Sequence, residues 1–173
     1  MFLALLIAPA LAAPEYHAEA SAQLLPDTVA LDTRFRMEGE HDGYVMAAAR
    51  LDPSGTWIGR TGIGFDVFGG GTGVDLRLGL FLGGTGDWTE PSLYGRPAAG
   101  AEAELAVRIR RVYGSFRHMD GFAGPLEDRL TEDELRLGFR VTDHVKVHGQ
   151  WLMLNPGDQT WRPSVGIGAE TIF

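Results

Sequence analysis

The sequence predicts an all-β fold, an antiparallel up-and-down barrel of eight strands. Three observations predict it. Apolar and polar residues alternate with a period of two along most of the chain from Thr28 onward, which is typical of strands with unlike faces. Turn-forming residues separate the alternating runs, for example at 53–55 and 155–158. Helical spacing is not sustained anywhere in the sequence.

The alternation divides the chain into eight predicted strands of about nine to eleven residues, the length that crosses a bilayer at the tilt of a barrel. They span residues 29–38, 44–51, 57–67, 74–83, 102–110, 134–141, 145–153 and 161–173. An even number of strands returns both ends to the same side. Residues 114–131 then fall where an extracellular loop is expected. Residues 84–99 fall where a short periplasmic turn is expected, which their length fits badly.

The last strand carries a resemblance to a known family. One face consists of Val165, Ile167, Ala169, Thr171 and Phe173, and the other is small or polar apart from Ile172. This pattern resembles the closing strand of outer-membrane β-barrel proteins such as the OmpA-type barrels, which ends in Phe after alternating apolar residues. The resemblance implies a transmembrane barrel, and it implies that Phe173 takes part in insertion by the barrel-assembly machinery.

The N-terminal segment has the features of an export signal. Residues 1–12 combine a short apolar core with small residues at Ala10 and Ala12, although a basic start is missing. A buried core strand is the alternative. We therefore predict a signal peptide at 1–12, a short periplasmic leader at 13–27 and a transmembrane barrel at 28–173. The predicted location is the outer membrane of a Gram-negative-type bacterium.

Composition narrows the function classes. The chain has 173 residues, which fits one domain, and no cysteine, so neither a disulfide nor a thiolate metal site is expected. A net charge of -8 argues against nucleic-acid binding. No apolar run approaches the roughly eighteen residues of a helical span, so a membrane form of this chain must be a closed barrel.

Alternation alone does not separate an outer-membrane barrel from a soluble lipocalin-like ligand-binding barrel, whose apolar face points inward. The polar face is rich in glycine, which would make room for long side chains in a narrow lumen. It is also rich in Arg, and Lys146 is the one lysine, which suits packed ion pairs, unless a GC-rich genome explains the bias. Trp57, Tyr113, Trp151 and Trp161 lie toward strand ends, as interfacial aromatics do. We therefore expect the polar face to point inward.

Charged residues on that face are predicted to form a cross-barrel network with trapped water, because an unpaired buried charge would cost several kcal/mol. The expected members are Asp32, Arg34, Arg36, Glu38, Arg50, Arg60, Asp66, Asp75, Arg77, Glu102, Glu104, Arg108, Arg110, Glu134, Arg136, Arg140 and Glu170. Such a network closes the lumen, so we expect little or no conductance.

One segment offers weak catalytic candidates: His118 and Asp120, with Glu132 or Glu134 nearby. It resembles in part the motif of lipid A deacylase barrels, in which a His precedes a nucleophilic Ser by two residues. Asp120 stands at the nucleophile position, where it would not support acyl-enzyme chemistry. The simpler interpretation is a loop histidine and a solvated carboxylate.

The sequence therefore predicts a monomeric, non-enzymatic barrel with a structural or interaction role, whose partners are membrane lipid, lipopolysaccharide and the assembly machinery. The alternatives are a lipid acyl hydrolase that uses His118 and the soluble ligand-binding barrel. No cofactor and no metal site is predicted, since His17, His41, His144 and His148 show no ligand clustering beyond the spacing of the last two.

Overall fold

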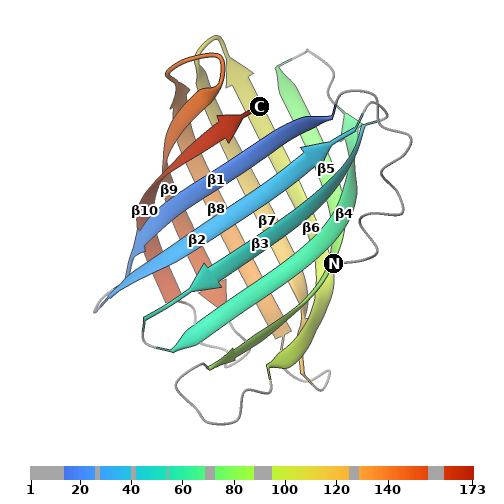
Figure 1. Ribbon diagram of the computed structural model, residues 1–173, viewed down its shortest axis with the longest axis vertical. Helices are drawn as coiled ribbons and strands as arrows, with labels where there is room; N and C mark the ends of the chain where they lie inside the picture. Colours follow the sequence, from blue (N-terminus) through green and yellow to red (C-terminus); the bar gives the residue numbers. More distant parts are fainter. Residues whose placement is uncertain are drawn as a thin grey trace.

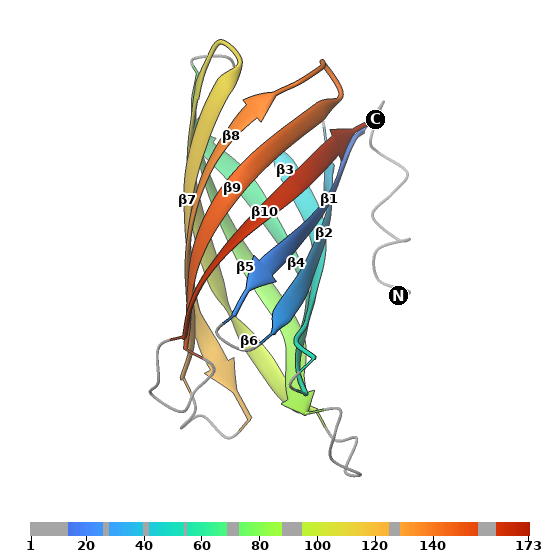
Figure 2. The same ribbon diagram turned by 90° about the vertical axis from the view of Figure 1, so that its left-hand side faces the viewer.

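The computed structural model describes residues 14–25, 28–39, 42–53, 55–68, 73–87, 95–124, 129–155 and 162–173. These residues form ten strands that close into an antiparallel barrel, in which each strand pairs with its neighbours in sequence and the first pairs with the last (Figures 1 and 2). The strands are β1 Glu15–Leu24, β2 Val29–Glu38, β3 Gly43–Leu51, β4 Thr56–Phe68, β5 Val74–Asp87, β6 Arg96–Ile109, β7 Val112–Ala123, β8 Arg129–Arg140, β9 Val145–Asn155 and β10 Arg162–Ile172. Within the described residues, no helix is long and apolar enough to cross a membrane.

The all-β, up-and-down architecture is as predicted, but the strand count of eight is wrong. The first strand that the sequence missed is β1, which occupies most of the segment predicted as a leader at 13–27. Its outward positions between Tyr16 and Leu24 are all alanines, Ala18, Ala20 and Ala22, so the alternation has little hydrophobic contrast. The predicted signal peptide at 1–12 lies outside the described residues.

The second missed strand is β7, most of which lies in the predicted loop at 114–131. Its outward positions include Gly114, His118 and Asp120, and these break the apolar stripe that Phe116 and Phe122 would otherwise form. The hairpin between β6 and β7 has only Arg110 and Arg111 as its turn. A two-residue turn without glycine or asparagine gives no sequence signal of the usual kind.

The additional strand β1 also explains why residues 84–99 fitted badly as a short periplasmic turn. Because β1 precedes all the others, the connections between β2 and β6 move to the opposite end of the barrel from the one expected, and the second missed strand, β7, returns the later connections to the expected ends. We call the end that holds Glu15 and Phe173 the terminus end, and the opposite end the loop end. The connection between β5 and β6 lies at the loop end, and β5 and β6 themselves take up residues 84–87 and 96–99.

Outward and inward faces are distributed as the sequence predicted. The leucines of β5 point away from the barrel axis, and Leu80 is 65% exposed. Arg77 on the same strand lies on the other face, where it contacts acidic side chains inside the barrel. The soluble lipocalin-like alternative requires the reverse arrangement, and this structure gives it no support.

Several inward-facing glycines make room for large lumen side chains. A Cβ atom on Gly64 would collide with the ring of Tyr44, and one on Gly138 would collide with the ring of Tyr113. A Cβ on Gly168 would meet the imidazole of His148. The absence of side chains at these positions lets the aromatic and imidazole rings lie over the neighbouring strand.

The loop-end half of the lumen holds an apolar core. Its buried residues come from β3 to β9 and include Met46, Ile58, Phe81, Ala98, Met119, Ala123, Leu130, Leu152 and Leu154. Most charged side chains collect in the other half, toward the terminus end, although the buried Gln23, Arg50 and Ser164 lie toward the loop end. The fold therefore gives the lumen a mainly apolar half and a charged half.

Candidate functional site

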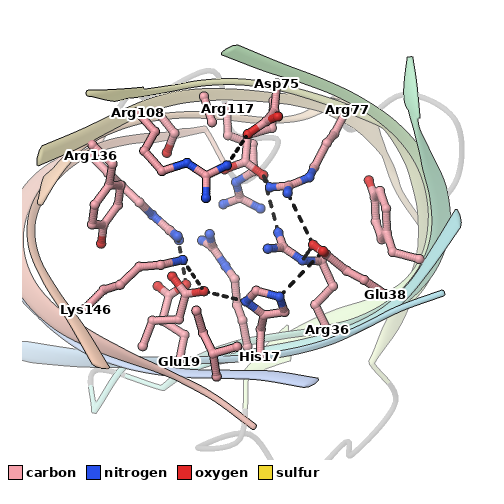
Figure 3. Close-up of a pocket in the computed structure, with 18 of the residues that line it drawn as sticks. His17, Glu19, Arg36, Glu38, Asp75, Arg77, Arg108, Arg117, Arg136 and Lys146 are labelled. Carbon is pink, nitrogen blue, oxygen red and sulfur yellow. Dashed lines mark hydrogen bonds and ion pairs between the residues drawn. The ribbon is translucent and has the colours of Figure 1, made fainter. Parts of the chain in front are cut away.

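The charged half of the lumen contains a cavity of about 330 Å³ that opens at the terminus end. Figure 3 shows charged side chains that point into it from all round the wall. Barrel diameter grows with strand number, and about eight strands leave a lumen that side chains can just fill. With ten strands the lumen is wider, and part of it stays open.

At the inner limit of this cavity, Glu134 on β8 is the centre of an ion-pair network. Its carboxylate accepts hydrogen bonds from Arg34 Nη2 at 2.8 Å, Arg117 Nη2 at 2.7 Å and Arg136 Nε at 2.8 Å. Its side chain is only 1% exposed. Because Arg34 lies on β2 and Arg117 on β7, Glu134 joins distant parts of the wall through the middle of the barrel.

Glu132, two residues before Glu134, extends the network toward the apolar core. It contacts Arg117 and accepts a hydrogen bond from Arg60 Nη2 at 3.4 Å. Arg60 Nη1 also lies 2.8 Å from Met119 Sδ, which belongs to the apolar core. Arg60 therefore brings the charged network into direct contact with the apolar core.

A second set of ion pairs lines the mouth at the terminus end. Arg77 lies 2.9 Å from Asp66, 3.2 Å from Glu38 and 3.7 Å from Glu104. Arg36 adds a contact of 2.7 Å to Glu38. These pairs follow the wall from β2 to β6 and leave the middle of the mouth open.

His17 on β1 lies in the same mouth. Its Nδ1 is 2.6 Å from Glu170 Oε1, and Lys146 Nζ is 3.0 Å from the same oxygen. Its Nε2 faces Glu15 at 3.0 Å and Glu38 at 3.6 Å. One imidazole is thus surrounded by carboxylates from β1, β2 and β10.

Basic residues are concentrated at the β6–β9 side of the mouth. Arg110 and Arg111 in the β6–β7 turn and Arg140 at the end of β8 line the cavity, and no ion pair joins them to any described residue. Arg108 has a loose pair with Asp75 at 3.5 Å. Lys146 lies over the ring of Tyr113, 5.6 Å from its centroid.

The residues predicted for the lumen network lie on the inward face or at the mouth. Those with ion-pair partners inside the barrel are Asp32, Arg34, Arg36, Glu38, Arg60, Asp66, Asp75, Arg77, Glu102, Glu104, Arg108, Glu134, Arg136 and Glu170. Arg50 is buried, and Arg110 and Arg140 line the cavity.

Sequence reasoning missed Glu19 and Arg117, because both lie on the strands that it did not identify. Arg136 Nη1 donates to Glu19 at 2.7 Å, and Arg117 binds Glu134. Strict alternation along residues 15–24 and 112–123 would have placed both side chains in the lumen. It also missed Glu132, which it assigned to a catalytic role.

The catalytic candidates are not brought together. His118 and Asp120 project from the outer face of β7, where His118 Nδ1 lies 2.6 Å from Asp133 and Asp120 pairs with Arg129 at 2.6 Å. Glu132 points into the lumen on the other side of the wall. The sequence prediction that these residues form one constellation is wrong, since strand parity separates them.

The predicted interfacial aromatic residues do not all lie on the outer face of the barrel. Trp57 and Trp151 face outward, and the Trp57 ring lies against Gly84, Gly86 and Gly95. Tyr113 points into the lumen instead, where its hydroxyl lies 3.1 Å from His148 Nδ1. Trp161 lies outside the described residues.

Phe173 lies on the outer surface, 65% exposed, and stacks on Tyr16 at a centroid distance of 5.9 Å. The Tyr16 ring also lies 6.0 Å from that of Phe35. These three rings form an outward aromatic cluster at the seam where β10 meets β1.

Comparison with known proteins shows the fold. The sequence matches no protein-family model and no curated protein. Among solved structures, the KdgM porin has a TM-score of 0.56 at 6% identity, over 90% of this chain and 98% of that one. The KdgM porin in complex with disordered oligogalacturonate has a TM-score of 0.57 at 7% identity over the same shares of the two chains. The NanC porin has a TM-score of 0.51 at 8% identity, also over 90% and 98%. The chain therefore has the porin-like fold of outer-membrane β-barrels.

Proposed function

We propose that this chain is a monomeric, non-enzymatic protein of the outer membrane, with a structural or interaction role and a lumen that does not conduct. The single observation that carries this proposal is the packing of the lumen. The Glu134 network crosses the barrel between β2 and β8, and the apolar cluster of β3 to β9 lies beyond it toward the loop end, which supports a closed lumen. An open channel would need a continuous polar path through both layers.

The outward face supports membrane lipid as the main partner. Large apolar side chains such as Leu82, Leu137 and Ile167 are exposed on it, in a belt that a soluble monomer would not present to water. The terminus end would face the periplasm and the loop end the lipopolysaccharide. The assembly machinery would engage β10 and Phe173.

Planar-bilayer recording of the refolded chain tests the closed lumen. We expect insertion without steady channels, because ions would have to displace side chains that are held by several partners. Steady, large conductance would overturn the proposal. Heat-modifiable gel mobility of the same sample provides the folding control, and fractionation after expression tests the location.

A second candidate is the binding of an acidic saccharide in the terminus-end cavity. It is favoured by Arg110, Arg111 and Arg140, whose charges are not matched by any ion pair within the described chain, and the KdgM porin has been solved with oligogalacturonate. Titration with a short oligogalacturonate tests it. Binding that is lost when all three arginines are replaced by Gln would support this candidate, and unchanged binding would reject it.

A further inference from the structure

Three side chains converge on one point at the terminus-end mouth. Glu15 and His17 are two residues apart on β1, so both point into the lumen, and Glu15 is the direct cross-strand partner of Glu38 on β2. One nitrogen of His17 and one oxygen from each carboxylate lie within 4.8 Å of one another. Figure 3 shows the His17 imidazole and Glu38 pointing toward each other inside the barrel.

The distances suit a small cation. His17 Nε2 lies 3.0 Å from Glu15 Oε1 and 3.6 Å from Glu38 Oε2. A four-coordinate zinc ion has bonds of about 2.1 Å to nitrogen and oxygen, which separates its ligand atoms by roughly 3.4 Å. The two observed separations lie on either side of that value. The histidine-to-carboxylate separations are therefore within a few tenths of an ångström of those that zinc requires.

The second observation is that His17 is buried and that its Nε2 atom makes no well-formed hydrogen bond. The residue is 7% exposed, and its Nε2 has no hydrogen-bond partner of acceptable geometry among the described residues, although Glu15 is close. Its other nitrogen, Nδ1, is held by Glu170 at 2.6 Å. A carboxylate on one ring nitrogen fixes the tautomer and directs the lone pair of the other, as in most protein metal sites with a histidine ligand.

The two oxygens of Glu38 have separate neighbours. Arg36 Nε and Arg77 Nη2 contact Oε1, at 2.7 Å and 3.2 Å, while Oε2 is the oxygen that faces His17. The arginines hold the carboxylate in place and leave one oxygen for a ligand. Their charge lowers the affinity for a cation. Glu15 is 58% exposed, which gives an ion a route from solution.

We propose that Glu15, His17 and Glu38 bind one divalent cation of the zinc class, with Glu170 as a positioning residue. One imidazole nitrogen with two carboxylate oxygens is a donor set that zinc accepts, with water in the fourth position, whereas calcium and magnesium select oxygen ligands. The ion links β1 to β2, and through His17 and Glu170 it also links them to β10. It therefore adds a cross-link where the first and last strands of the barrel pair.

The test is a zinc titration of the metal-stripped full chain in detergent micelles, in competition with a chromogenic chelator. We expect one zinc ion per chain. Glu15→Gln and His17→Ala should each weaken binding at least tenfold, and Glu170→Gln should weaken it by about 10- to 100-fold. His144→Ala removes a histidine at the same end that lies outside the cluster, and it should leave the affinity unchanged.

Heat-modifiable gel mobility verifies that each variant folds, and Glu15→Gln is the safest because that side chain is largely exposed. X-ray absorption at the zinc edge should show one nitrogen neighbour from imidazole and otherwise oxygen neighbours. No zinc binding by the unaltered chain would overturn the proposal. Equal affinity in the folded Glu15→Gln variant would overturn it too, because Glu15 would then not be a ligand.

Discussion

Arg34 on β2 donates a hydrogen bond to Glu134 on β8 over 2.8 Å, and so joins two strands that β1, β10 and β9 separate in the wall. The same carboxylate binds Arg117 and Arg136. A single acidic side chain therefore balances guanidinium groups from three strands in the middle of the lumen. The closed lumen that we propose depends on it.

Replacing Glu134 with Ala should strongly destabilise the barrel. The change leaves Arg34, Arg117 and Arg136 short of a partner in a buried site, where breaking an ion pair on one side costs about 3–5 kcal/mol. Urea unfolding in lipid vesicles measures the loss. Asp75→Asn is the matched control, because Asp75 pairs only loosely, at 3.5 Å, with the half-exposed Arg108. The control should lose no more than about 1 kcal/mol, and equal losses in the two variants would contradict the central role of Glu134.

Gly138→Ala should also destabilise the barrel, by about 1–3 kcal/mol, since the new methyl group would overlap the Tyr113 ring. Tyr113 would have to move and give up its hydrogen bond to His148. Thermal unfolding measured by circular dichroism provides the readout. Gly149→Ala is the control, because a Cβ there meets only a backbone oxygen at 4.0 Å. If Gly138→Ala matched this control in stability, Tyr113 would not be wedged against the wall.

Much of the architecture follows from periodicity. Strands such as β5 and β10 could be predicted directly, because they have large apolar residues on one face and polar or small residues on the other. The same alternation placed Arg34 and Glu134 on the inner side of the barrel. Periodicity did not identify the strands whose outward face has few large apolar residues. In β1 that face is mostly alanine, and in β7 His118 and Asp120 interrupt it.

The candidate site was harder to predict for the same reason. Its centre depends on Arg117 and Glu19, and its mouth on His17, and all three lie on the two missed strands. Register is also not visible in the sequence. The pairing of Glu15 with Glu38, which places two carboxylates beside His17, follows from how β1 aligns with β2. When a strand is missed in the sequence, none of its cross-strand contacts can be predicted.

Replacing His118 with Ala should not change the release of acyl chains from lipid A. His118 and Asp133 form a partly exposed pair on the outer face, and pairs of this kind contribute about 0–1 kcal/mol. Release of acyl chains from lipid A, measured by mass spectrometry of membranes that contain either form, should be the same for both. Acyl release that depends on His118 would restore the hydrolase alternative.

Leu80→Arg tests most directly whether the outward face meets lipid. Leu80 lies in the middle of β5 and is 65% exposed. In a water-soluble barrel, a change at so exposed a site would shift stability by no more than about 0.5 kcal/mol. In a bilayer, an arginine at the midplane of the lipid face costs about 2–4 kcal/mol, whereas near the interface the cost falls to about 0–1 kcal/mol. Ile109→Arg, at the terminus end of β6, is the interfacial control. Unfolding in phosphatidylcholine vesicles should therefore show a large loss of stability for Leu80→Arg and a small one for Ile109→Arg. Similar small losses of stability in both variants would mean that the apolar belt does not lie in a membrane.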